Sequence, residues 1–137
     1  MLSHLIYVSN RKADCTEKEI ENILSSCKKN NPPMNITGVL LYSDRKFIQL
    51  VEGDSRTIMD LYNKIKLDSR HEKARMISYG PIKEKSFPSW HMASRNLSNQ
   101  LTYHTEMSAD DQVVFDRLLT GEAEDGSKVL TVLKKFF

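Results

Sequence analysis

The 137-residue sequence predicts an α+β domain with a C-terminal extension, because short apolar segments of strand character alternate with two amphipathic helical segments. Hydrophobic residues make up 39% of the chain and charged residues 28%, which is the balance of a globular protein rather than a disordered one. No apolar run approaches the roughly 18 residues of a membrane span, and the first residues, MLSHLIYVSNRK, are charged too early for a signal peptide. We therefore expect a cytoplasmic protein with no membrane partner.

The chain begins with a predicted strand and helix. Residues 4–9 (HLIYVS) are apolar, rich in residues that favour strands, and followed by Asn10. Thr16 and Glu19 then have the spacing of a capping box. Apolar residues recur at helical spacing from there to Lys29, which predicts an amphipathic helix.

A β-hairpin is predicted next. Pro32 and Pro33 end the helix, because proline cannot continue one. Residues 36–43 (ITGVLLYS) and 47–51 (FIQLV) flank a three-residue polar connection, as the two strands of a hairpin do. Both strands are almost continuously apolar, so we expect the sheet to be covered on both faces.

The second half of the main domain predicts another helix and two strands. The helix follows Gly53, with Asp54 or Ser55 as its cap. Residues 75–82 and 91–96 predict the strands. The resulting order βαββαββ predicts a ferredoxin-like mixed sheet with two helices on one face.

Residues 98–137 predict a helical extension to the main domain at residues 1–97. Ser108 is placed to cap a helix that ends at Gly121, and a second amphipathic segment runs from Ser127 to Phe137. We expect these helices to pack on the other face of the sheet or to contact another subunit, so that the protein is a homo-oligomer.

Charge and cysteine content narrow the range of partners. The 20 basic and 18 acidic residues give a net charge of +2, which does not indicate a nucleic-acid partner. Cys15 and Cys27 flank one predicted helix and would lie about 18 Å apart, too far for a disulfide. They are expected to be free thiols, and no spacing of ligands indicates a metal site.

Two polar side chains interrupt the apolar strands. Gln49 is at the centre of FIQLV and shares a face with Val51, and Tyr7 shares a face with Leu5. If the strands of Tyr7 and Gln49 run parallel side by side, as we expect, the phenol and the amide are matched hydrogen-bond partners on the helix-covered face. They form either a buried pair that only satisfies itself or the polar part of a ligand site.

Four segments carry a family resemblance: LIYVS at 5–9, KNNPPMNITGVLLYSDRKFIQLVEG at 29–53, LDSRH at 67–71 and FPSWHM at 87–92. In order and spacing they resemble the BLUF family, blue-light sensors that use FAD. The resemblance covers residues 1 to about 97. It implies a flavin bound non-covalently, FAD in the first place and FMN as the other candidate, in a slot between the two helices and the sheet.

The resemblance implies roles for individual residues. Tyr7 is similar to the photoactive tyrosine of the family and Gln49 to the glutamine that switches between tyrosine and flavin. Trp90 and Met92 match the W-x-M of the fifth strand, which relays the signal. The implied flavin contacts are Ile23 and Ile65 on the two ring faces, Asn30 with Asn31 beside it at the carbonyl and N3 edge, Arg70 at the pyrimidine end, and Asp68, His71 and Lys64 at the ribityl or phosphate part.

The implied mechanism is light-driven electron and proton transfer from Tyr7 to the flavin, followed by a change in the Gln49 hydrogen bonds and a red shift of absorption. No substrate would turn over, and we expect no fused catalytic domain, so the output would pass to a downstream protein. Two functions without flavin stay open for this fold: an acylphosphatase-type enzyme and an RNA-binding module.

Overall fold

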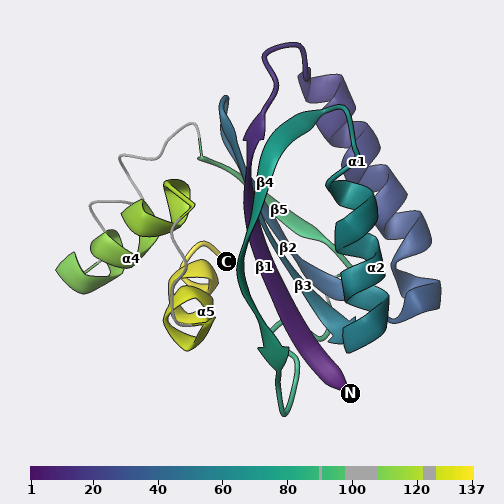
Figure 1. The fold of residues 1–137 in the computed structure, drawn as a ribbon, viewed down its shortest axis with the longest axis vertical. Helices are drawn as coiled ribbons and strands as arrows, with labels where there is room; N and C mark the ends of the chain where they lie inside the picture. Colours follow the sequence, from purple (N-terminus) through teal and green to yellow (C-terminus); the bar gives the residue numbers. More distant parts are fainter. Residues whose placement is uncertain (90, 98–107, 122–125) are drawn as a thin grey trace.

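The computed structural model describes residues 1–89, 91–97, 108–121 and 126–137. A five-stranded mixed sheet in the order β4-β1-β3-β2-β5 separates two layers of helices (Figure 1). The strands are β1 (Leu2–Arg11), β2 (Thr37–Tyr42), β3 (Lys46–Asp54), β4 (His71–Pro81) and β5 (Ala93–Asn96). The helices are α1 (Glu17–Asn30), the short η1 (Pro32–Met34), α2 (Ser55–Ile65), α4 (Ala109–Leu119) and α5 (Gly126–Lys134). The predicted ferredoxin-like order is confirmed.

The predicted helix starts are confirmed by side-chain caps. Thr16 accepts the backbone N–H of Glu19 at the start of α1, and Ser108 accepts that of Asp111 at the start of α4. Asp54 rather than Ser55 caps α2. These caps satisfy N–H groups that have no partner inside the first helical turn.

One predicted strand direction is wrong. β1 and β3 pair antiparallel, not parallel, and Tyr7 lies opposite Gln49 in the register. The reason is topological: β1 and β2 both pair antiparallel with β3, so they run in the same direction, and the β2–β3 hairpin reverses the chain. The helix between β1 and β2 is the crossover that parallel strands need. The reversed direction leaves the two side chains on one face.

Several strand bounds also differ from the prediction. β4 begins at His71, four residues before the predicted start, because its polar N-terminal residues pair with the end of β1 and give no apolar pattern. β5 begins only at Ala93, and its parallel pairing with β2 starts there. Met92 therefore precedes the strand in which it was placed, and Trp90 lies outside the described residues.

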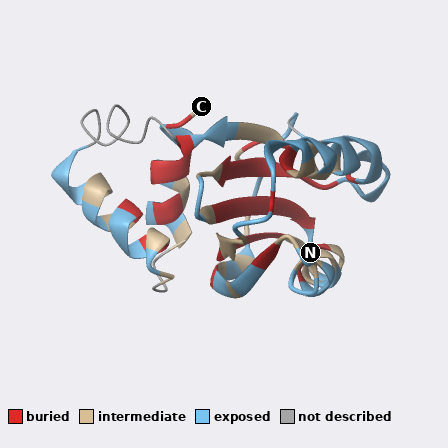
Figure 2. Cartoon of the chain, turned by 90° about the horizontal axis from the view of Figure 1, so that it is seen from above, coloured by how far each residue is buried: buried red, intermediate tan, exposed pale blue. Residues whose placement is uncertain are grey.

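The sheet is buried on both faces, as its apolar strands predict (Figure 2). On one face α1 and α2 cover a cluster that includes Leu5, Leu40 and Ile58. On the other, α4 and α5 contribute Phe115 and Val132 to a second cluster. The predicted packing of the C-terminal helices on the far face is thus confirmed. Among the described helices, none is long and apolar enough to cross a membrane.

Candidate functional site

A cavity of about 540 Å³ lies between the sheet and helices α1 and α2. Its volume falls in the range of roughly 300 to 1,000 Å³ that is usual for small-molecule sites. Aliphatic and aromatic side chains form most of its walls, and polar and charged side chains complete the lining. The lining residues are Tyr7, Ile23, Ser26, Cys27, Asn30, Asn31, Pro33, Met34, Leu40, Phe47, Gln49, Leu61, Lys64, Ile65, Asp68, Arg70 and His71.

Tyr7 and Gln49 form a hydrogen-bonded pair at the sheet side of the cavity. The phenol hydroxyl donates to the Gln49 Oε1 atom at 2.5 Å, and each residue is only 4% exposed. Burial raises the pKa of the Tyr7 phenol well above its ordinary value, so the phenol keeps its proton and acts as the donor. The Gln49 Nε2 atom donates to the Met92 sulfur at 3.5 Å. A single amide thus links Tyr7 to the residue just before β5.

His71 lies beside Tyr7, with 6.1 Å between the ring centroids. Its Nε2 atom is 2.5 Å from the Ile65 carbonyl oxygen, which can only accept, so Nε2 carries a proton. Its Nδ1 atom lies 2.7 Å from the Ser9 hydroxyl. Both ring nitrogens therefore have protein partners, and the buried ring supports the Tyr7 side of the cavity. Its predicted contact with the ribityl or phosphate part stays a prediction.

The two residues at the end of α1 differ sharply in burial. Asn31 is 2% exposed, and its Nδ2 atom donates to the His91 carbonyl oxygen at 2.8 Å. Asn30 lines the cavity from an exposed position. Asn31 is therefore the member of the pair that joins the end of α1 to the chain before Met92. Ile23 of α1 and Ile65 of α2 line the same cavity, as the predicted sandwich requires.

Charged side chains from the last turn of α2 and from the residues that follow it also line the cavity. The Arg70 Nε atom donates to the Asp68 Oδ1 atom at 2.8 Å, and a second guanidinium nitrogen contacts the other carboxylate oxygen. Hydrogen bonding from Arg70 lowers the pKa of Asp68 below its ordinary value. Lys64 adds an exposed ammonium group. This part of the lining therefore offers both cationic donors and a carboxylate acceptor.

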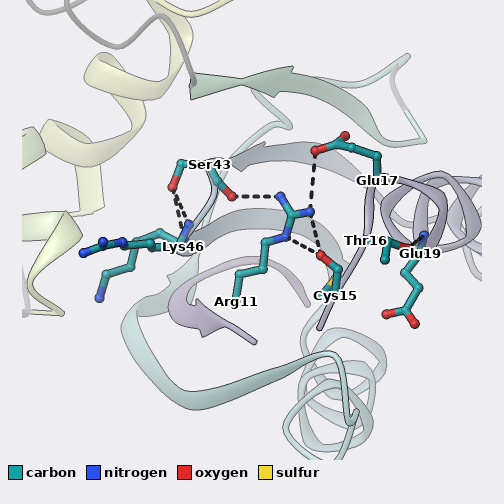
Figure 3. A network of polar contacts seen from close by, with 8 residues as sticks. Arg11, Cys15, Thr16, Glu17, Glu19, Ser43 and Lys46 are labelled. Carbon is teal, nitrogen blue, oxygen red and sulfur yellow. Dashed lines mark hydrogen bonds and ion pairs between the residues drawn. The ribbon is translucent and has the colours of Figure 1, made fainter. Parts of the chain in front are cut away.

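The N-terminal end of α1 is held by a residue that sequence reasoning missed. Arg11 donates from Nε and Nη2 to the Cys15 carbonyl oxygen at 3.1 and 2.7 Å, and from Nη1 to the Ser43 carbonyl oxygen at 3.0 Å (Figure 3). It thereby ties β1, the loop before α1 and the β2–β3 hairpin together. No local motif marks this role, because the partners are backbone carbonyls and one of them, Ser43, lies 32 residues further along the chain.

The composition of the cavity fits a flavin ring. Ile23, Leu61 and Ile65 supply apolar surface for a planar heteroaromatic system, whereas Gln49 and Asn31 are amides that match carbonyl and N–H edges. Phe47 and Leu40 line the sheet side. Phe47 shares the strand face of Gln49, as alternation predicts, and Leu40, which sequence reasoning missed, lies opposite Gln49 in the hairpin register. Among the described residues, no group of His, Cys, Asp and Glu could hold a metal ion.

Fold and site together define a small α+β domain in which a buried Tyr–Gln pair lines a cavity of the size of a small-molecule site. The family model for BLUF, "Sensors of blue-light using FAD", matches residues 2–93, and the chain belongs to this family of blue-light flavin sensors. The family match decides against the acylphosphatase-type and RNA-binding alternatives.

Curated relatives include much longer proteins. The chain is 31% identical over 94 residues to the photoactivated adenylate cyclase subunit beta of Euglena longa. The matched region covers 68% of this chain and 11% of the relative. It is 37% identical over 71 residues to the blue light- and temperature-regulated antirepressor BluF of Escherichia coli, with 52% of this chain and 18% of the relative covered. The chain thus spans between about a tenth and a fifth of these relatives.

Solved structures match over almost the whole chain. The photo-activated state of BlsA superposes with a TM-score of 0.81 at 27% identity, covering 99% of this chain and 94% of BlsA. The dark-state structure of the BLUF protein BlrB gives a TM-score of 0.72 at 23% identity, covering 97% and 96%. Because BlrB is only 23% identical, it supports the fold alone. The matches cover nearly all of both solved chains.

Proposed function

We propose that Tyr7 and Gln49 are the photoactive pair of this blue-light sensor and that FAD is the flavin that the cavity between α1, α2 and the sheet binds. The observation that carries the proposal is the continuous hydrogen-bond chain from Tyr7 through Gln49 to Met92, whose first two members line a cavity of suitable size. FMN shares the ring system of FAD and remains the alternative flavin.

We assign the flavin contacts to lining residues in the roles that the family resemblance implies. Ile23 and Ile65 would contact the two faces of the ring, and Asn30 and Asn31 its carbonyl and N3 edge. Arg70 would reach the pyrimidine end. Asp68, His71 and Lys64 would lie toward the ribityl or phosphate part, with His71 acting mainly through its support of Tyr7.

When bound, the flavin supplies an oxidant that blue light activates. Tyr7 gives up one electron from its ring and the proton of its hydroxyl, and takes both back, so the pair returns to its starting redox state. During this cycle the Gln49 acceptor loses its donor, which frees the amide to rotate or to tautomerise. The amide can then donate toward the flavin carbonyl, and its hydrogen bond to the Met92 sulfur is lost.

The signal would leave through the C-terminal part. We assign residues 1–97 to the photosensory domain and residues 98–137 to a capping and output extension, with Trp90 and Met92 as the relay. The α4 and α5 helices pack on the far face of the sheet and expose Val113. Output would then be a changed contact with a downstream protein or with a second copy of the chain, as the expected homo-oligomer implies.

Absorption spectroscopy tests the proposal. The purified protein should be yellow, should release FAD on denaturation, and should show a small red shift of the flavin band under blue light that reverses in the dark. Chromatography of the released flavin separates FAD from FMN. Protein that binds neither flavin, or a flavin band that light does not shift, would overturn the proposal.

A further inference from the structure

Glu52 is a buried carboxylate on the face of β3 opposite to Gln49. It is fully buried, and it follows Gln49 by three residues, so strand alternation places the two side chains on opposite faces. Its Oε2 and Oε1 atoms accept the backbone N–H groups of Ser86 and Phe87 at 2.8 and 2.9 Å. The chain between β4 and β5 is therefore anchored to β3 by a charge-assisted pair of hydrogen bonds.

We call the described residues 86–89 and 91–92 the crossing segment, because they contact opposite faces of the sheet. Its start is held by Glu52, and the Phe87 ring is buried in the cluster under α4 and α5. Its end is held by Gln49, and the Met92 side chain is buried in the cluster under α1 and α2. Two side chains of one strand thus hold the two ends of this crossing segment.

Two residues next to Glu52 each have a buried polar atom without a hydrogen-bond partner among the described residues. Thr37 of β2 and His4 of β1 are its register partners on either side, so the three side chains form a row across one face of the sheet. Within the part of the chain that the structure describes, the buried Thr37 Oγ1 and His4 Nδ1 atoms have no hydrogen-bond partner. Register partners have Cβ atoms about 4.5–5.5 Å apart, within reach of a carboxylate side chain.

The His4 ring can act as a donor toward Glu52. Its Nε2 atom lies 2.7 Å from the Ser78 hydroxyl, and burial lowers the pKa of His4, which favours the neutral ring. If Nε2 accepts from Ser78, Nδ1 carries the proton. The Thr37 hydroxyl and, in this tautomer, the His4 Nδ1–H group are therefore buried donors without partners among the described residues, and they flank a carboxylate whose present donors belong to a segment tied to Gln49. Unsatisfied buried donors cost free energy, so they favour any state that pairs them.

We propose that Glu52 is a positioning residue of the light response that exchanges its hydrogen-bond partners. In the dark it holds Ser86 and Phe87. When Gln49 releases Met92, the crossing segment leaves Glu52, and the carboxylate accepts from Thr37 and His4 instead. The exchange gives the sheet two discrete arrangements with similar numbers of hydrogen bonds, which is what a two-state relay needs. This inference rests on the proposed photoactive role of Gln49.

Thr37→Val is the decisive variant, because it removes a hydroxyl that has no partner in the structure while keeping the side-chain shape. Flavin content, dark spectrum and melting temperature should not fall. The light state loses one hydrogen bond, so its dark recovery should be about fivefold faster than that of the wild type. A recovery time equal to that of the wild type would contradict the exchange of partners.

Amide hydrogen exchange gives an independent readout on the wild-type protein with flavin bound. Blue light should increase exchange at the Ser86 and Phe87 amides. Glu52→Gln, which keeps only one acceptor oxygen, should raise exchange at these amides already in the dark. Glu84→Gln removes an exposed carboxylate close in sequence and serves as the control, with wild-type exchange expected. If Glu52→Gln does not fold, Ser86→Pro removes one of the two donor N–H groups and should raise exchange at the Phe87 amide already in the dark.

The outcomes separate the two proposals. A wild type without a light-induced red shift defeats the proposed function. A wild type with the red shift, but with the same exchange at Ser86 and Phe87 in light and dark, defeats only the role of Glu52.

Discussion

The Tyr7 hydroxyl donates to the Gln49 side-chain oxygen at 2.5 Å from directly across an antiparallel strand pair. Register partners on one sheet face keep a fixed separation, because the backbone ladder on both sides resists their movement. The donor and the acceptor are therefore held in place before any ligand binds. Such preorganisation is what a short-range transfer of a proton requires.

Gln49→Leu should retain flavin and lose the light-induced red shift. Leucine fills a similar volume but cannot connect Tyr7 to a flavin carbonyl. The variant also leaves the buried Tyr7 hydroxyl without its acceptor, which costs about 1–3 kcal/mol of folding free energy. Difference absorption spectra before and after blue light are the measurement. A normal shift and recovery would remove Gln49 from the mechanism.

Tyr7→Phe should also bind flavin and fail to give the red shift, because the ring keeps its shape and loses its proton. The measurement is the same difference spectrum, with transient absorption to follow electron transfer. The control is the double variant Tyr7→Phe with Phe47→Tyr, which has a phenol at another position of the lining. It should also lack the red shift. A wild-type shift in Tyr7→Phe would point to another donor, with Trp90 tested first.

Asn30→Ala should weaken flavin binding by about 1–2 kcal/mol, the range for one hydrogen bond to a buried ligand. Asn31→Ala should have a larger effect, because it also removes the donor to the His91 carbonyl. Flavin titration monitored by fluorescence quenching gives both dissociation constants. Equal affinity of Asn30→Ala and wild type would show that this residue serves only to end α1.

Asp68→Asn should lower stability at neutral pH and have no effect in strong acid. Arg70 holds the pKa of Asp68 below its ordinary value, so the carboxylate stabilises the fold above the unfolded-state pKa of about 3.9 and ceases to do so as the pH falls through the lower folded-state value. Melting temperatures of the apoprotein across pH 2 to 7 test this. A difference between variant and wild type that persists unchanged to the lowest pH would contradict the assigned sign.

The sequence predicted what local chemistry determines. Thr16 and Ser108 cap their helices because a side chain three residues before an N–H suffices. The shared face of Tyr7 and Gln49 follows from strand alternation, even though the strand direction was mispredicted. The anchoring by Glu52 was not predictable, because its donors come from a loop 34 and 35 residues further along the chain.

The burial difference between Asn30 and Asn31 was not predictable for a related reason. It depends on which side of the last turn of α1 faces the sheet. The short helix η1, with two prolines, follows that turn at once. Helix rotation is decided by packing of Ile20 against the sheet, which no residue near the helix end reveals. Arg11 and Asn31 share the same limit, since Arg11 donates to the backbone carbonyl of Ser43 and Asn31 to that of His91, both far away in the sequence.

The crossing segment has a thermodynamic consequence. It places Phe87 in one hydrophobic cluster and Met92 in the other, only five residues apart. Neither layer of helices can then lose order without disturbing side chains that the opposite layer buries, so the molecule should unfold as one cooperative unit despite its two cores. By linkage, a ligand that binds on the α1 and α2 side raises the free energy needed to open α4 and α5 on the other.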